Sequence, residues 1–173
     1  MLYMQGKTSI IGMHPNRGNF AAELVKRAQR AGDDASIATI GVWEFVGLTG
    51  RWSRVLALYE YRDGWADACR QIRQIMQQPS PELAEIYRVA DSMRSGGVDD
   101  LLEPLPGCPT LDDLRAAGHG PLLVAETARV PAGGEDAYAA GLRASFGPVA
   151  ARHGLQLLGV DPLGTVDDRF RVG

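Results

Sequence analysis

The stretch "GVWEFVGLTGRWSRVLALYEYRD", residues 41–63, decides the fold that this sequence predicts. Each half is a short run of β-branched and aromatic residues, and the "GLTG" between them has the small residues that a tight turn needs. We therefore expect residues 37–46 and 52–61 to form an antiparallel hairpin. Because aromatic residues are concentrated in both strands, the hairpin is either the wall of an active site or only the middle of a sheet.

Side-chain parity gives the predicted hairpin two unlike faces, since successive side chains of a strand point to opposite sides. One face holds the aliphatic residues, with two charged residues near the ends of the second strand: Ala38, Ile40, Val42, Arg54, Leu56, Leu58 and Glu60. The other face holds the aromatic residues: Thr39, Trp43, Phe45, Ala57, Tyr59 and Tyr61. We expect the aliphatic face to pack against helices and the aromatic face, with Trp43 near Tyr59, to line a lumen where a flat ligand stacks. Two alternatives stay open: the rings fill a subunit interface, or the faces are reversed and Arg54 and Glu60 point inside.

The segments around the hairpin complete a recognisable order of elements. Residues 3–11 are compatible with a strand, and apolar residues at helical spacing follow from about residue 20 until Gly32. After the hairpin, Asp63 can cap one helix, and Ser80 followed by Pro81 starts another. The prolines of "VDDLLEPLP" predict a short edge strand. The order is β-α-β-β-α-β with the last helix in two pieces, which is the ferredoxin-like split βαβ unit.

A second, incomplete copy of this unit is predicted in the rest of the chain. The hairpin sequence "GVWEFVGLTGRWSRV", residues 41–55, is similar to "GVDPLGTVDDRFRVG", residues 159–173, and a strand and a helix at matching spacing precede the second stretch. We therefore predict an α+β protein with a ferredoxin-like unit at residues 1–106, a linker at 107–119 and a partial second ferredoxin-like repeat at 120–173. The missing pieces leave sheet edge and apolar surface to be covered, which predicts a homodimer or higher homo-oligomer.

Charge and composition narrow the function classes. The formal net charge is −3, and acidic and basic residues are interspersed, so we expect no binding to nucleic acid or to an anionic membrane. No apolar run approaches the roughly 20 residues of a membrane helix, and the N-terminal sequence lacks the pattern of a secretory signal. The two cysteines, Cys69 and Cys108, have no metal-like spacing. We expect a cytoplasmic protein with free thiols.

Titratable residues give few further signals. The three histidines, His14, His119 and His153, are far apart and have no partner at ligand spacing, so we expect no metal site. His14 follows the first strand at the predicted lumen mouth, where it is either a general base or a solvated loop residue. The carboxylate pair Asp99–Asp100 is expected on a turn or at a strand end, and solvated turn chemistry is its default interpretation.

The sequence also resembles the NIPSNAP-like group of the dimeric α/β-barrel superfamily. The resemblance is carried by "RVLALYEY", by "QQPSPELAEIYRVADSM" leading into "LLEPLP", and by "GPVAARHGLQLLGV", and it covers roughly residues 35–172. It implies two ferredoxin-like units whose sheets enclose a lumen. It also implies relatives that include cofactor-free monooxygenases, cyclases and isomerases, haem enzymes, and proteins with no assigned activity. The group has no shared catalytic motif to carry over.

These observations predict a cofactor-independent enzyme of secondary metabolism, of cyclase, isomerase or monooxygenase type, acting on a hydrophobic aromatic or polyketide-like metabolite in the lumen. Tyr59, Tyr61 and His14 are the candidates for proton transfer. Trp43, Phe45 and Arg54 are the candidates for substrate binding. The alternative is a non-catalytic ligand-binding or assembly protein whose aromatic sheet face is an interface.

Overall fold

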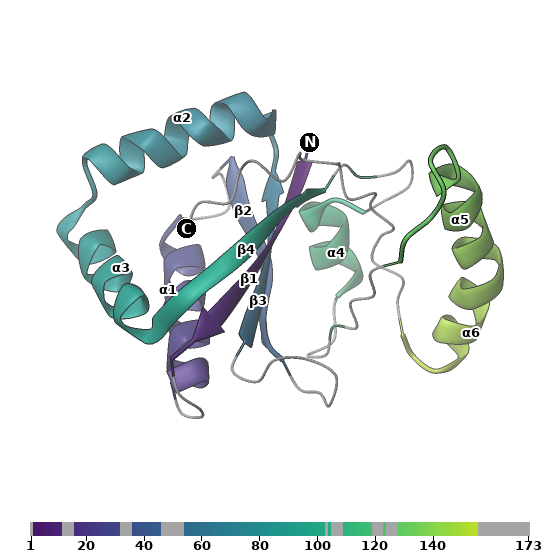
Figure 1. The fold of residues 1–173 in the computed structure, drawn as a ribbon, viewed down its shortest axis with the longest axis horizontal. Helices are drawn as coiled ribbons and strands as arrows, with labels where there is room; N and C mark the ends of the chain where they lie inside the picture. The colour runs from purple at the N-terminus through teal and green to yellow at the C-terminus, as the bar shows by residue number, and fades with distance from the viewer. Residues whose placement is uncertain are drawn as a thin grey trace. The chain divides into compact units, whose positions relative to one another are not determined.

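The computed structural model of the chain describes residues 2–11, 16–31, 36–45, 54–102, 104, 109–118, 123 and 128–155 (Figure 1). The chain divides into two compact units. The first comprises residues 1–102 and 163–173, and the second comprises residues 103–162.

The first unit contains a four-stranded sheet in the order β2-β3-β1-β4. The strands are β1 (Leu2–Ile10), β2 (Ile37–Glu44), β3 (Arg54–Tyr61) and β4 (Arg94–Leu102), and every neighbouring pair is antiparallel. Long crossovers through helices and a single hairpin between β2 and β3 give this order, which is the ferredoxin-like one. The predicted fold class is confirmed, and so is the edge position of the last strand.

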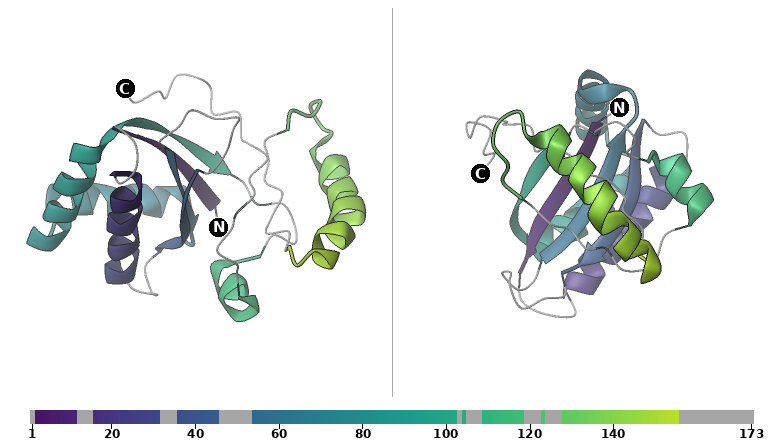
Figure 2. Two further views of the ribbon diagram at one scale, coloured as in Figure 1. Left: turned by 90° about the horizontal axis from the view of Figure 1, so that it is seen from below. Right: turned by 90° about the vertical axis from the view of Figure 1, so that its right-hand side faces the viewer.

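Three helices accompany the sheet: α1 (Asn16–Ala31), α2 (Gly64–Gln77) and α3 (Pro81–Met93). The helices α1 and α3 lie side by side on the same side of the sheet (Figure 2). The core between them and the sheet is built from Ile10, Phe20, Val55 and Ala90, which are all buried. Burial of such side chains contributes about 1.5–3 kcal/mol each, which fixes α1 and α3 on this face.

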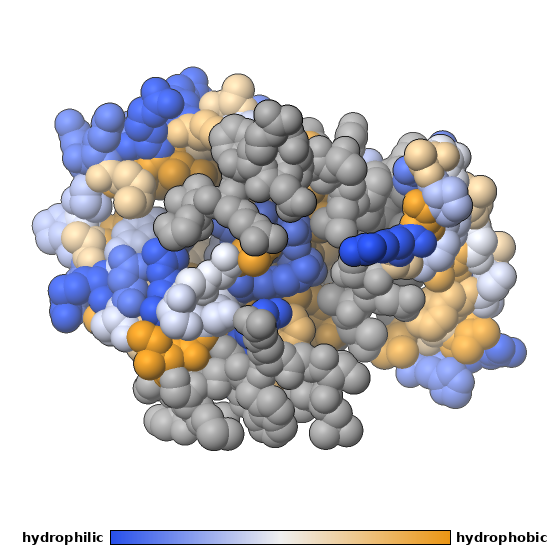
Figure 3. Space-filling model, in the orientation of Figure 1, coloured by the Kyte–Doolittle hydropathy of each residue, from blue (hydrophilic) through white to orange (hydrophobic). Residues whose placement is uncertain are grey.

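The predicted N-terminal capping is confirmed at α3 and is absent at α2. The Ser80 side chain accepts a hydrogen bond of 3.2 Å from the Leu83 N–H, and Pro81 occupies the first turn. Asp63 occupies the N-cap position of α2, but its side chain makes no capping hydrogen bond there. Among the residues of α2, Ala68 alone is buried. In Figure 3, the outer edge of this helix, at the upper left, is hydrophilic, and hydrophobic residues lie beneath it.

The register of the sheet corrects the predicted faces. Tyr59 pairs with Thr39 across the hairpin, whereas Trp43 pairs with Leu56, because the register shifts between Thr39 and Gly41. This irregularity gives β2 one extra residue, as a β-bulge does, and reverses the parity of the strand beyond it. Paired residues share a face, so Trp43 lies on the face of Leu56 and not on the face of Tyr59. The prediction that Trp43 and Tyr59 share a face is wrong.

The second correction concerns which face the helices cover. Val55 and Ile10 belong to the helix-packed core, and alternation along β3 places Ala57, Tyr59 and Tyr61 on the same face as Val55. The tyrosines therefore lie on the face that packs against helices. Arg54 and Glu60 lie on the opposite face, which is the reversed arrangement that the sequence left open.

The second unit contains α4 (Leu111–Ala117), α5 (Glu135–Gly141), the π-helical turn η1 (Leu142–Phe146) and α6 (Gly147–Arg152). The helical segment 135–152 agrees with the helix predicted for the second repeat. The strands predicted at 121–130 and 155–160 lie mostly outside the described residues, and the described residues 123 and 128–130 form no strand. The partial second repeat stays a prediction.

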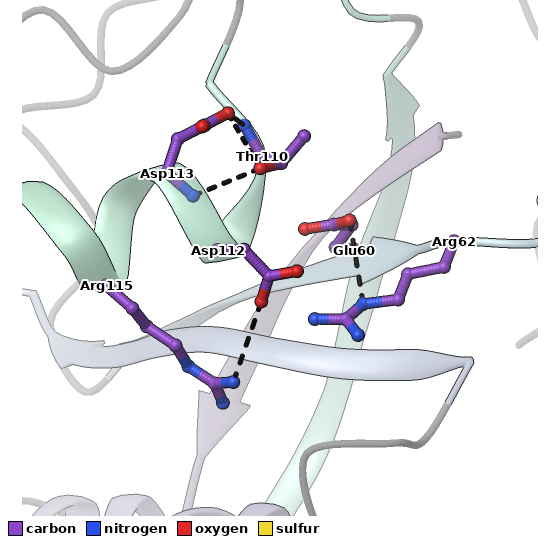
Figure 4. Close-up of polar contacts among 6 residues, drawn as sticks. All are labelled: Glu60, Arg62, Thr110, Asp112, Asp113 and Arg115. Carbon is purple, nitrogen blue, oxygen red and sulfur yellow. Dashed lines mark hydrogen bonds and ion pairs between the residues drawn. The ribbon is translucent and has the colours of Figure 1, made fainter.

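The segment predicted as a linker contains a helix, α4. The Thr110 side chain accepts a hydrogen bond from the Asp113 N–H, and the Asp113 carboxylate accepts one from the Thr110 N–H at 2.8 Å (Figure 4). This capping box satisfies backbone donors that otherwise have no partner at a helix start. An ion pair of 3.9 Å between Asp112 and Arg115 lies on the same helix. Residues 111–117, within the predicted linker, are therefore helical, and the linker itself stays a prediction.

Candidate functional site

The residues with free polar groups gather around Gly6, at the middle of β1 on the helix-covered face. Gly6 pairs with Ala57 of β3 on one side and with Asp99 of β4 on the other. A Cβ atom built at Gly6 would lie 3.1 Å from the Asp99 Oδ1 atom and 3.8 Å from the Tyr59 Cε2 atom. The absence of a side chain at Gly6 therefore lets the Asp99 carboxylate and the Tyr59 ring approach the backbone of β1 closely. We call Gly6, Tyr59 and Asp99, with the two helix residues described next, the Gly6 site.

The helices supply the remaining two residues of this site. The Arg27 guanidinium of α1 lies over the Tyr87 ring of α3, with its carbon 5.0 Å from the ring centroid. This is a cation–π contact, which holds the guanidinium without neutralising its charge. The charge of Arg27 lowers the pKa of Tyr59, and the charge of Asp99 raises it, so both charges act on the phenol. The residues of the Gly6 site thus come from five elements, β1, β3, β4, α1 and α3.

The polar groups of the Gly6 site have no hydrogen-bonding role in the described part of the fold. In the described part of the chain, no hydrogen bond or ion pair engages the Tyr59 hydroxyl, the Asp99 carboxylate or the Arg27 guanidinium. Asp99 is exposed, and Tyr59 and Arg27 are half-buried, so these groups can be reached by water or by a ligand. A donor, an acceptor and a cation that are open in this way can bind a polar ligand.

Burial shifts the acid–base chemistry of the site. It is the main reason that the pKa of Tyr59 is raised above its ordinary value, so the phenol is protonated at neutral pH and donates a hydrogen bond. Burial is likewise the main reason that the pKa of Asp99 is raised, although Arg94 lowers it. Asp99 as a whole residue is exposed on the edge strand, so its carboxyl group is only partly withdrawn from water. A carboxylate with a raised pKa is a stronger base than an ordinary aspartate.

Tyr61, the second tyrosine predicted to act in proton transfer, is engaged in packing. It is almost fully buried, its hydroxyl donates to the Met4 Sδ atom at 3.0 Å, and its ring contacts the Trp65 ring with centroids 5.7 Å apart. Burial also raises the pKa of Tyr61 strongly. We assign Tyr61 a supporting position next to the site, because its hydroxyl already has a partner.

The three predicted substrate-binding residues are brought together, but on the opposite face. The Phe45 N–H donates to the Arg54 carbonyl oxygen at 2.9 Å, and Trp43 lies two residues before Phe45. A ligand held against one face of a sheet does not reach the other face. Trp43, Phe45 and Arg54 therefore do not contact the same ligand as Tyr59, which corrects the single site expected from the sequence.

Other predicted residues do not extend the Gly6 site. His14 lies outside the described residues. Among the described residues, no group of three or more His, Cys, Asp or Glu side chains could hold a metal ion. No described helix has the length and apolar character needed to cross a membrane.

A groove of about 550 Å³ between α1 and α3 differs from the Gly6 site in its charges. Its lining includes Glu23, Lys26, Arg30 and Glu82. These groups are paired with one another, Lys26 with Glu23 at 2.5 Å and Arg30 with Glu82 at 3.6 Å. The groove therefore offers fewer free polar groups to a ligand than the Gly6 site does.

Sequence reasoning missed Gly6, Arg27, Tyr87 and Asp99. The signal for Asp99 was present: in a strand, Asp99 and Asp100 must point to opposite faces. Asp100 pairs with Lys7 at 2.7 Å on one face, and Asp99 lies beside Gly6 on the other. The interpretation of the two carboxylates as a solvated turn is wrong.

Comparison with known proteins bears on the fold. No protein-family model matches the sequence, and no curated protein matches it. Solved structures with a similar fold include an uncharacterized NIPSNAP domain protein from Burkholderia xenovorans, with 17% identity over 64% of this chain and 100% of that one, at a TM-score of 0.47. A NIPSNAP-like domain protein from the same organism has 16% identity over 63% of this chain and 89% of that one, at a TM-score of 0.49. A Deinococcus radiodurans protein described as a proposed antibiotic biosynthesis monooxygenase has 11% identity over 64% and 98%, at a TM-score of 0.44.

At these identities and TM-scores the likeness assigns neither a family nor an activity to this chain. The chemistry of this chain has to be inferred from its own residues.

Proposed function

We propose that this chain is a cofactor-independent enzyme that moves a proton on a small hydrophobic, aromatic or polyketide-like metabolite bound at the Gly6 site. The observation that carries the proposal is the gathering of Tyr59, Asp99 and Arg27 around a bare glycine, none of them hydrogen-bonded or ion-paired within the described part of the chain. The Tyr59 and Tyr87 rings give the site apolar walls, which suit a flat ligand.

The groups suggest one division of labour. A ketone oxygen of the substrate accepts a hydrogen bond from the Tyr59 hydroxyl and lies near the Arg27 guanidinium. The Asp99 carboxylate removes a proton from the neighbouring carbon, and the C–H electron pair becomes the enolate, whose oxygen Tyr59 and Arg27 stabilise. Where a double bond adjoins that carbon, the enolate is a dienolate, and the Asp99 carboxyl returns the proton to the far carbon of the double bond, which moves into conjugation with the ketone. This sequence isomerises the substrate, or prepares it for ring closure, with protein side chains alone.

The proposal is tested with 2-tetralone, a flat hydrophobic ketone, in D₂O. We expect the wild-type chain to accelerate exchange of the protons next to the carbonyl, followed by proton NMR. Asp99→Asn removes the base and should slow the catalysed exchange about 100-fold or more, within the range for general bases. Tyr59→Phe removes one oxyanion donor and should slow it about 10-fold or more.

The matched control is Arg70→Gln, which removes a positive charge from the exposed side of α2 and should leave the exchange unchanged. Calorimetry of 2-tetralone binding separates the two function classes. If the ketone binds but exchanges no faster than in buffer, the chain is a ligand-binding protein and the enzyme proposal is wrong. Equal activity of Asp99→Asn and wild type would also overturn it.

A further inference from the structure

Arg54 carries an unpartnered buried donor on the opposite face of the sheet. The Arg54 Nε atom is buried and has no hydrogen-bond partner. Each buried donor without a partner costs roughly 1–3 kcal/mol, more when it is charged. Such a group persists where something outside the described chain accepts its hydrogen bond.

The carboxylates on this face are engaged elsewhere. Asp100 forms the 2.7 Å ion pair with Lys7. Glu60 is buried and lies 3.8 Å from the Arg62 Nε atom (Figure 4). Glu60 is also six residues from Arg54 on the same strand, about 20 Å at the rise of an extended chain. The end of the sheet near Arg54 therefore has positive charge without an acidic partner among the described strand residues of this face.

Two aromatic side chains flank Arg54. Phe45, the residue after β2, lies opposite it, and Trp43 is the diagonal neighbour on the same face. A Cβ atom built at Gly41 would lie 2.3 Å from the Trp43 Cη2 atom and 2.5 Å from Cζ2. The indole therefore lies down over Gly41, away from Arg54, and does not cap the guanidinium. The guanidinium therefore shares its face with Phe45 and Trp43, and the indole leaves it uncovered.

We propose that Arg54, Trp43 and Phe45 form a second binding site, which takes the carboxylate of a flat aromatic acid. The carboxylate accepts a hydrogen bond from the Arg54 Nε–H, a charge-assisted bond of the stronger kind, and the ring of the acid packs against Trp43 and Phe45. Arginine suits this task because its planar guanidinium matches a carboxylate. This site is separate from the Gly6 site and does not depend on the enzyme proposal.

The test is calorimetric titration of the full chain with 2-naphthoate at neutral pH, with 2-naphthalenemethanol as the neutral analogue of the same shape. We expect the acid to bind at least 10-fold more tightly than the alcohol. Arg54→Gln should weaken 2-naphthoate binding at least 10-fold and leave the alcohol unchanged. Trp43→Ala should weaken both ligands. Arg54→Lys keeps the charge without the Nε donor, and binding should be weakened to an intermediate degree.

The controls separate this site from the Gly6 site. Arg70→Gln removes one positive charge from α2, and Tyr59→Phe alters the Gly6 site; both should bind 2-naphthoate as the wild type does. Circular dichroism checks that each variant is folded, and Arg54→Lys gives a second measurement if Arg54→Gln is not. The proposal is overturned if the two ligands bind equally, or if Arg27→Gln weakens 2-naphthoate binding and Arg54 variants do not.

Discussion

Neighbouring residues of one strand have different environments on the two faces of the sheet, as Asp99 and Asp100 show most clearly. Asp100 points to the face opposite α1 and α3 and forms a 2.7 Å ion pair with Lys7. Asp99, one residue earlier, lies beside Gly6 on the helix-covered face, where burial raises the pKa of its carboxyl group. The same residue type has a structural role on one face and a free carboxylate on the other. The face of the sheet on which an aspartate lies, more than its neighbours in sequence, therefore decides whether its carboxylate is ion-paired.

Among the substitutions that test this difference between the two faces, Gly41→Ala should have the largest effect on the unfolding free energy. The new methyl group overlaps the Trp43 ring, so the ring or the strand must move, and overpacking of this kind costs about 1–3 kcal/mol of unfolding free energy. Chemical denaturation measures the loss. Gly41→Ala should also weaken 2-naphthoate binding, because the indole is displaced toward Arg54.

A double-mutant cycle with Trp43→Ala sharpens this prediction. Without the indole the methyl group has room, so the cost of Gly41→Ala should nearly disappear in that background. Gly141→Ala is the matched control, since no atom lies within 4 Å of a Cβ built there. It should be neutral or stabilising by up to about 1 kcal/mol. An unchanged cost of Gly41→Ala in the Trp43→Ala background would show that the indole does not lie over Gly41.

Asp99→Asn and Asp100→Asn should change the stability of the protein by smaller amounts, and with opposite signs from each other. Because folding raises the pKa of Asp99 above its ordinary 3.8, the ionised carboxylate costs stability above the raised pKa. Below 3.8 the carboxyl group is protonated in both states and the cost is absent. Asp99→Asn should therefore stabilise the protein at pH 7, by less than about 1 kcal/mol since the residue is partly solvated, and should have no such benefit near pH 3.

Asp100→Asn removes the ion pair with Lys7 and should destabilise the protein at pH 7 by up to about 1 kcal/mol. Melting temperatures at both pH values give the comparison. Equal effects of the two substitutions at pH 7 would mean that the two faces do not differ as described.

The strand order and the helix positions follow from local patterns, and the sequence predicts them. The turn residues between 46 and 50 and the periodicity of the flanking strands specify the hairpin. Ser80 and Pro81 specify the start of α3, which the hydrogen bond from Leu83 confirms. These features depend on residues close together in the sequence, where simple steric and hydrogen-bonding rules apply.

The face on which each side chain of β2 lies could not be predicted by counting alternate residues along the strand. The register shift between Thr39 and Gly41 inserts one residue, so every side chain beyond it changes face. Gly41 was a possible signal, since glycine inside a strand often marks a bulge. The assembly of the Gly6 site is also beyond local patterns, because Arg27, Tyr87 and Asp99 come from three elements that meet only in the folded chain.

The helix α4 was missed for a different reason. Prolines and glycines around it suggested a linker, while the pair Thr110 and Asp113, three residues apart, was a local capping signal. The seven residues of α4 contain only two buried side chains, Leu111 and Leu114, so the apolar periodicity was too short to indicate a helix.

The most direct test of the Gly6 site is the pKa of Tyr59, measured by NMR with ¹³C-labelled tyrosine rings and assigned with Tyr59→Phe. Asp99 raises this pKa and Arg27 lowers it. We therefore predict that Asp99→Asn lowers the pKa of Tyr59, that Arg27→Gln raises it, and that Arg54→Gln, on the other face, leaves it unchanged. A pKa that responds to Arg54→Gln as strongly as to Arg27→Gln, or that responds to neither Asp99→Asn nor Arg27→Gln, would contradict the proposed arrangement of the two faces.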